Sequence, residues 1–202
     1  MAGERKKRVV GRPEPCILRA DFDRAIGTIA HRQAGRVSRE QLLAAGVTVA
    51  AIRARVRAGR LIRLHDGVYA IDRRDDARAR HWAAVLAVGE DGVVSHLSAA
   101  AEHRMIRRAP IVVDVTTPRR LPCRDGVRIH TRALEPESLT ARDGMPLTTP
   151  AQTLFDLATT LGADSLAEVA NEGFVRGIVT AEDLDATLDR NARRKGAAAF
   201  RA

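Results

Sequence analysis

The sequence of 202 residues predicts an α+β fold in two parts. Three observations predict it: apolar residues recur at helical spacing between residues 21 and 59, two β-prone runs meet at an Asp-Gly turn just after them, and strands alternate with helices further on. The expected organisation is a flexible basic arm over residues 1–20, a small helical domain over residues 21–75 and a mixed α+β domain over residues 76–202.

Positive charge is concentrated in the first part of the chain. Residues 1–75 carry 17 basic and 8 acidic side chains, a net charge of +9, whereas residues 76–202 carry 17 of each. A basic module joined to a neutral one is typical of a protein that binds a polyanion. Within the second part, residues 135–189 have a net charge of −9. This acidic block indicates either a solvated helical face or a docking surface for a basic protein.

The first predicted helix starts at Asp21 and stops near Gly35, with apolar residues at helical spacing. The preceding residues 1–20 are polar, basic and broken by two prolines, which indicates a flexible arm. A second helix opens at Ser38, with Gln41 three residues later. This spacing predicts a capping box, in which each side chain satisfies a free backbone N–H group.

A third helix is capped by Thr48 and runs to about Ala58. Helical spacing divides its residues into two sides. The expected buried side holds Val49, Ile52 and Val56, and the expected exposed side holds Ala50, Ala51, Ala54 and Ala58. Arg53 and Arg57 border one edge of the alanine side and Arg55 the other. Small side chains let a backbone approach closely, and guanidinium groups beside them can reach phosphates or guanine edges in a major groove.

A β-hairpin is predicted directly after the third helix, because two β-prone runs flank Asp66-Gly67. Three helices followed by such a hairpin make a winged helix-turn-helix, a DNA-binding motif. The alternative, that the arginines only solvate an exposed helix and strand, stays open. The candidate DNA-binding residues are Ser38, Arg39, Thr48, Arg53, Arg55, Arg57, Arg60, Arg63, His65 and Gly67.

The second part predicts a mixed sheet covered by helices. Two helices are expected at residues 80–88 and 95–105. Three more follow: one starts at Thr149, the last starts at Thr180, and the third lies between them. The expected strands lie at residues 93–94, 111–117 and 127–131. A turn is expected at residues 143–144. The cap at Thr149 is followed by Pro150, which suits a first helical position.

No catalytic, metal or cofactor site is predicted, so we expect a protein that is not an enzyme. The sequence has no Walker-type loop, dinucleotide fingerprint or nucleophile elbow, and Asp114 lacks the acidic-x-Lys partner of a metal-dependent nuclease. His96 and His103 can share a helix face, but structural roles are favoured over metal ligation. The lack of a long apolar run and of a secretory signal predicts a cytoplasmic protein without membrane contact. In the cytoplasm, Cys16 and Cys123 are expected to stay reduced.

The run GRVSREQLLAAGVTVAAIRARVRAGRLIRLHDGVYAI resembles the N-terminal winged-helix domain of AbiEi-type antitoxins, the DNA-binding partners in type IV toxin–antitoxin systems. The segments VVSHLSAAAEHRM, VTTPRR and GMPLTTPAQTLFDLA resemble the second domain of the same proteins. Taken together and in this order, these segments extend over nearly all of the chain from Asp21 onward. The chain departs from the family at Glu102 and His103, where relatives often place an aromatic residue.

The resemblance implies a transcriptional autorepressor that binds double-stranded DNA at inverted repeats in its own promoter. It also implies an antitoxin-like α+β second domain that counteracts a toxin resembling a nucleotidyltransferase. The DNA contacts that it implies are Ser38, Arg39, Thr48, Arg53, Arg57 and the wing from Arg63 to Gly67. Many relatives continue into a domain similar to the very-short-patch-repair endonucleases. One alternative is therefore a regulatory remnant of such an endonuclease protein, without its catalytic domain. Another is a protein-interaction module that uses the acidic block at residues 135–189.

Overall fold

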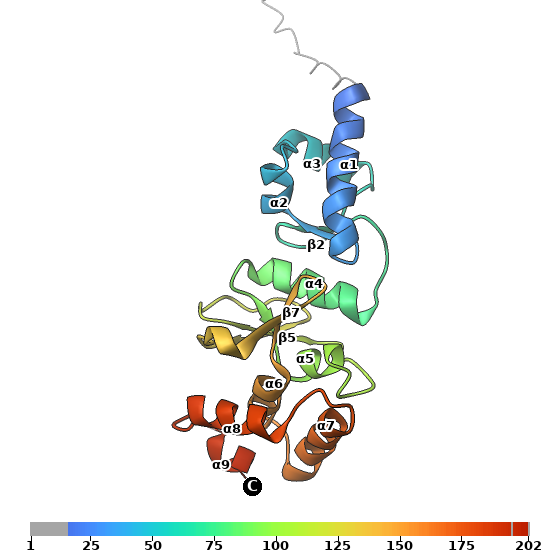
Figure 1. The fold of residues 1–202 in the computed structure, drawn as a ribbon. Coiled ribbons are helices and arrows are strands. Elements are labelled where there is room, and N and C mark those ends of the chain that lie inside the picture. The colour runs from blue at the N-terminus through green and yellow to red at the C-terminus, as the bar shows by residue number, and fades with distance from the viewer. Residues whose placement is uncertain (1–15, 195, 202) are drawn as a thin grey trace, which may run out of the picture.

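The computed structural model describes residues 16–194 and 196–201. Most of the predicted arm, residues 1–15, lies outside the described residues. Its last five residues do not belong to an arm, because the first helix, α1 (Cys16–Arg32), already includes them. Figure 1 shows an elongated molecule with the N-terminal helices at one end and the last helices at the other. Within the described residues, no helix is both long enough and apolar enough to cross a membrane.

We call the first part, up to residue 72, the head. After α1 it contains β1 (Arg36–Ser38), α2 (Arg39–Ala44), α3 (Val49–Arg57), β2 (Ile62–His65) and β3 (Val68–Ala70). Its antiparallel sheet has the strand order β1-β3-β2, and the predicted hairpin β2–β3 is present with a bulge between Arg63 and His65. These elements make a winged helix-turn-helix. Strand β1 was not predicted, because three residues are too few to show a period of two.

The caps predicted in the head are confirmed. Ser38 Oγ accepts from the Gln41 backbone N–H at 3.2 Å, and Gln41 Oε1 accepts from the Ser38 N–H at 3.0 Å, which completes the capping box. Thr48 Oγ1 accepts from the Ala51 N–H at 3.2 Å and so begins α3. The turn between α2 and α3 uses Gly46 at a φ of +82°, a conformation that residues with a Cβ rarely adopt. The caps therefore set where α3 starts and how it leaves α2.

We call residues 76–201 the body. It begins with α4 (Ala77–Val88), β4 (Val93–Val94), α5 (His96–Glu102), β5 (Val113–Thr117), β6 (Val127–Thr131) and the short 3-10 helix η1 (Pro136–Ser138). It continues with β7 (Leu139–Arg142), β8 (Met145–Thr148), α6 (Pro150–Leu157), α7 (Ala163–Val175), α8 (Ala181–Arg190) and α9 (Ala197–Arg201). Helix α4 starts three residues before the predicted helix, because Asp76 accepts from the Ala79 N–H and caps it.

The body sheet has the strand order β6-β5-β4-β8-β7 and mixes parallel with antiparallel pairs. The strands at 113–117 and 127–131, both expected from the sequence, pair in parallel. Helix α4 lies between this sheet and the head sheet, since it contacts β1, β2 and β3 on one side and β4 and β5 on the other. Helices α5 and α6 follow on the far side, with α7, α8 and α9 beyond them (Figure 1). The α+β fold is confirmed.

The head and the body are each stabilised by apolar clusters of their own. In the head, Ile26 of α1, Leu42 of α2, Ile52 of α3 and Leu61 pack in one cluster. In the body, α6 supplies Leu154 and its neighbours to a cluster shared with α5, α7 and the residues that follow α7. A fully buried Leu-sized side chain contributes roughly 1.5–3 kcal/mol relative to an exposed one. Each part therefore has an apolar core of its own, with α4 as the layer between them.

Candidate nucleic-acid interface

The outer face of α3 is formed by Ala50, Arg53, Ala54 and Arg57, which are all exposed and recur at helical spacing. Ala51, by contrast, is 1 % exposed and packs with Ile52 in the head core. The prediction that Ala51 lies on the exposed side was therefore wrong. Alanine occurs on both buried and exposed sides of helices, so the residue type could not predict on which side Ala51 lies. The exposed face presents two guanidinium groups beside two small side chains, an arrangement compatible with a helix that enters a major groove.

Arg55 does not lie at the edge of that face. It is 6 % exposed, its Nε lies 2.8 Å from Asp23 Oδ1, and its guanidinium lies 5.5 Å from the centre of the Phe22 ring. Its predicted exposed placement was wrong, because α1 supplies a carboxylate and an aromatic ring that draw the side chain inward. Arg55 thus holds α3 against α1.

Ser38 is also turned inward, at 5 % exposure, with its hydroxyl in the capping box. Thr48 stays exposed at the start of α3. Gly67 contributes its backbone, since its carbonyl oxygen accepts from the Arg39 N–H at 2.7 Å and joins the hairpin turn to the start of α2. The side chain of Arg39 is exposed. The structure thus brings the hairpin turn and the start of α2 together. Thr48 and the arginines of α3 belong to the head as well.

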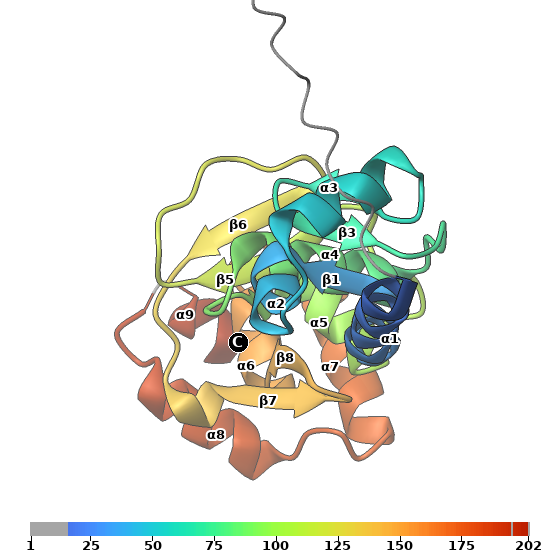
Figure 2. The same ribbon diagram turned by 90° about the horizontal axis from the view of Figure 1, so that it is seen from above.

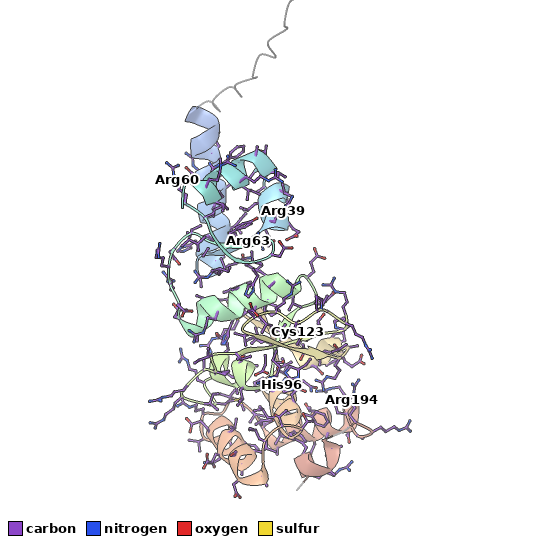
Figure 3. All side chains as sticks on the ribbon, turned by 180° about the vertical axis from the view of Figure 1, so that it is seen from behind. Arg39, Arg60, Arg63, His96, Cys123 and Arg194 are labelled. Carbon is purple, nitrogen blue, oxygen red and sulfur yellow. The ribbon has the colours of Figure 1, made fainter. Side chains whose placement is uncertain are left out.

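The remaining candidates flank the hairpin. Arg60 has a 65 % exposed side chain with Nη1 3.6 Å from Asp23, and Arg63 has a 60 % exposed side chain paired with Asp66 at 2.6 Å. His65 lines a cleft between the head and the body, and burial is the main cause that lowers its pKa below the ordinary value. Figure 3 shows Arg39, Arg60 and Arg63 in the head, and Arg194 at the opposite end of the molecule. His65 therefore lies where the head meets the body.

Looking down on the head, Figure 2 shows α1, α2 and α3 in front of the rest of the molecule. The body contacts the head through α4, which packs on the head strands. The three helices and α4 are thus on opposite sides of the head sheet. The exposed face of α3 is consequently not covered by the body.

A second group of chemically capable side chains lies in the body sheet. The rings of His96 and His130 stack with centroids 3.7 Å apart, and His130 Nε2 lies 2.9 Å from Asp114 Oδ1. Ser95 Oγ accepts from Thr116 Oγ1 at 2.8 Å. Ser95 and Asp114 are 0 % and 1 % exposed. Ser95 and Asp114 therefore belong to the hydrogen-bonded core of the body.

His96 and His103, whose spacing allowed a shared helix face, have different partners. His96 packs on His130, whereas the ring Nε2 of His103 lies 2.7 Å from the carbonyl oxygen of Thr148. Glu102, one of the departures from the family pattern, lies 2.7 Å from Nδ1 of the buried His81. The interactions of His96 and of His103 are therefore structural. In the part of the chain that the structure describes, no three His, Cys, Asp or Glu side chains come together as a metal site.

Burial of His96 makes the stability of the fold depend on pH. Desolvation, followed by the neighbouring His130, lowers the pKa of His96 from 6.5 to about 3. The unfolded chain therefore binds a proton at this position more readily than the folded chain below pH 6.5, and the free energy of unfolding falls as the pH drops from about 6.5 toward 3. The loss from this group approaches about 1.4 kcal/mol per pH unit inside that window.

A urea titration of the chain at pH 7 and pH 5 tests this prediction. Replacing His96 with Asn is a suitable control, because Asn does not titrate and tolerates the φ of +48° that His96 adopts. We expect the free energy of unfolding to fall less in H96N than in the natural chain. Equal pH slopes for the two proteins would show that His96 is not the group responsible.

The head is similar in sequence to one described protein family. Residues 24–71 match the family model described as "Transcriptional regulator, AbiEi antitoxin". The fold is similar to the crystal structure of the Rv2827c protein from Mycobacterium tuberculosis, with a TM-score of 0.52 and 20 % identity over 88 % of this chain and 73 % of that one. At that identity the similarity concerns the fold alone. No curated protein is a significant match in sequence.

The matched segment runs from within α1 to the residue after β3, so it contains the helix-turn-helix, the hairpin and the exposed face of α3. It includes every residue that was singled out as a candidate DNA contact. Residues 24–71 thus match this family model in sequence and form a winged helix-turn-helix in the structure.

Proposed function

We propose that this chain is a DNA-binding transcriptional regulator that inserts the outer face of α3 into the major groove, and that it is not an enzyme. The observation that carries the proposal is the exposed row of Ala50, Arg53, Ala54 and Arg57 on a capped helix. The family match supports it, because that family is described as transcriptional regulators.

The surroundings of α3 favour contact with a polyanion. Five arginines and no acidic residue occur between Thr48 and His65. Asp23 and Asp66 form ion pairs with Arg55, Arg60 and Arg63 of this segment, and the charges of Arg53 and Arg57 are proposed to serve phosphates or guanine edges. Thr48 at the start of α3 and Arg39 on α2 are suited to contact the DNA backbone.

The regulator is further proposed to be the antitoxin of a toxin–antitoxin pair. In this role the head represses its own promoter at inverted repeats, and the body binds a toxin resembling a nucleotidyltransferase. The description of the matched family as antitoxins supports this assignment. The separate cores of head and body support a domain boundary between residues 75 and 76, at the cap of α4. Co-expression with such a toxin encoded beside this chain is expected to restore the growth of cells that the toxin arrests.

A direct experiment uses the full chain and the DNA upstream of its own gene. A gel-shift titration compares that duplex with a shuffled duplex of the same length and base composition at one salt concentration. Specific recognition predicts at least about a thousandfold tighter binding of the upstream duplex. Equal affinity for the two duplexes would leave only a non-specific DNA-binding protein, and lack of binding to both would refute the proposal.

A further inference from the structure

A pocket of about 440 Å³ lies beside the segment that joins the head to the body. Its lining comes from the turn after α1, the connecting segment, the first turns of α4, the end of α5 with the loop after it, and β7. Figure 1 shows the end of α1, the connecting segment and the loop after α5 on the same side of the molecule. Small-molecule sites usually measure roughly 300–1,000 Å³ and often lie where two domains meet. The pocket has the size and the position of such a site.

Arginine dominates the charged lining, so we call this site the arginine pocket. Among the described residues that line it, only Asp76 and Glu102 are acidic, whereas five are arginines. The arginines come from the connecting segment, α4, the loop after α5 and β7, and they are Arg74, Arg78, Arg104, Arg107 and Arg142. The fold therefore gathers five positive charges from distant parts of the sequence around two negative ones.

The two acidic residues of the pocket compensate only two of these arginines. Glu102 Oε2 accepts from Arg78 Nη1 at 3.2 Å, and Asp143 pairs with the same guanidinium at 2.9 Å. Asp76 caps α4 with one carboxylate oxygen, and its other oxygen lies 3.8 Å from Arg74 Nε. The positive charges of Arg78 and Arg74 are therefore balanced within the protein.

The other three arginines, Arg104, Arg107 and Arg142, form no ion pair with any side chain in residues 16–194 or 196–201. Arg104 and Arg107 are exposed, and Arg142 is half-buried. The Nη1 of Arg142 donates to the carbonyl oxygen of Glu102, which orients the guanidinium but does not neutralise its charge. Three positive charges therefore meet at one pocket without a carboxylate to balance them, and an anion placed among them would be attracted by all three.

The backbone at Arg104 is a second observation that concerns this pocket. Arg104 has a φ of +63° just after α5. Its N–H donates to the carbonyl oxygen of Ala101, and the N–H of Met105 donates to that of Ala100, which together make a Schellman motif. The residue with positive φ in this motif is usually glycine, because a Cβ is unfavourable there. The chain thus places a guanidinium group at the pocket in a position where glycine would suit the backbone better.

We propose that the arginine pocket binds a small molecule that carries a diphosphate group. A ligand that balances three arginines needs two or more negative charges close together, and the planar guanidinium fork matches the oxygens of a phosphate group. Arg104, Arg107 and Arg142 donate to the phosphate oxygens, and the uncharged part of the molecule lies against Ile106 and the nearby alanines of the lining. The proposal goes beyond the contact with DNA, because no residue of the outer face of α3 lines this pocket.

The test is isothermal titration calorimetry of the full chain with inorganic pyrophosphate and, separately, with orthophosphate, at one fixed ionic strength. Pyrophosphate stands in for the diphosphate group. We expect one pyrophosphate to bind per chain, about tenfold tighter than orthophosphate, because its second phosphate group reaches arginines that a single phosphate group does not. No DNA is present, so a failure of this test is distinct from a failure of the proposed regulatory function.

Two neighbouring arginines supply a matched pair of variants. Arg107 lines the pocket, whereas Arg108 is also exposed but does not line it. Arg107→Ala is expected to weaken pyrophosphate binding by at least about tenfold, through the loss of charge-assisted hydrogen bonds. Arg108→Ala removes the same charge from the same loop and is expected to bind pyrophosphate as the natural chain does.

Arg104→Gly separates a role in binding from a role in folding. Glycine adopts the φ of +63° without strain, so we expect this variant to melt at the same temperature as the natural chain or above it. Its affinity for pyrophosphate is nevertheless expected to fall by at least about tenfold. Unchanged affinity in Arg104→Gly would contradict the assignment of Arg104 to the site.

Three further results would overturn the proposal. The first is an absence of pyrophosphate binding to the natural chain. The second is an equal loss of affinity in Arg107→Ala and Arg108→Ala, which would indicate diffuse attraction to a basic surface. The third is a loss of affinity for the upstream duplex in Arg107→Ala as large as that in R53A/R57A, which would assign the pocket to the DNA backbone instead of a small molecule.

Discussion

Replacing Arg53 and Arg57 together with alanine is expected to weaken binding of the upstream duplex by about 1–3 kcal/mol for each arginine that contacts a base. Both side chains are exposed on α3, and alanine is an excellent helix former, so the change removes guanidinium groups without unfolding the helix. The affinity is measured by fluorescence anisotropy at a fixed salt concentration, and the melting temperature of the variant is measured alongside.

A matched control removes the same amount of charge elsewhere. Arg193 and Arg194 are exposed, and Figure 3 shows Arg194 at the end of the molecule away from the head. The double variant R193A/R194A lowers the net charge by the same two units as R53A/R57A. We expect it to bind the duplex nearly as the natural chain does. If both double variants lost the same affinity, the effect would be one of net charge, and the interface on α3 would be wrong.

Replacing Asp156 with alanine is expected to destabilise the fold by about 3–5 kcal/mol, the cost of breaking a buried ion pair by removing one partner. Asp156 Oδ1 accepts from Arg132 Nη2 at 2.5 Å and from Gln152 Nε2 at 2.7 Å, and its side chain is 0 % exposed. Burial raises the pKa of this carboxyl above its ordinary value in spite of the nearby Arg132. Removing the charged carboxylate from water is therefore unfavourable, and the hydrogen bonds of Asp156 offset that cost.

The same network extends to two further elements. Gln152 Oε1 accepts from Ser138 Oγ at 3.0 Å and from Asn191 Nδ2 at 3.1 Å, which joins η1 and the end of α8 to α6. Asp156→Asn is the control, because its amide oxygen can still accept from Arg132 and Gln152. For a chain of this size, 3–5 kcal/mol corresponds to a fall in melting temperature of about 10 °C. A melting temperature of Asp156→Ala that matched that of Asp156→Asn would contradict this account of the network.

Much of the fold could be predicted from the sequence because its signals are local. The caps at Ser38, Thr48, Thr149 and Thr180 each predicted the start of a helix, and all four helices are present. The Asp-Gly turn predicted the hairpin in the same way. A side chain that closes a hydrogen bond three residues away needs no information from the rest of the chain.

The errors concern features that depend on contacts between distant residues. Helical spacing placed Arg55 at one edge of the alanine side, but Asp23 and Phe22, about thirty residues earlier, draw it into the head. Strand β1 exists only because β3 pairs with it. The arginine pocket could not be predicted either, since its walls come from the connecting segment, α4, the loop after α5 and β7.

The central claim is that the cationic face of α3 binds the phosphate-lined groove of double-stranded DNA. The most direct measurement is the affinity of the natural chain and of R53A/R57A for the upstream duplex over a series of salt concentrations. We expect the logarithm of the association constant to fall linearly with the logarithm of the salt concentration, and the slope to become shallower by roughly one unit for each lost phosphate contact in the variant. Affinity that did not change with salt, or the same slope for both proteins, would contradict the claim.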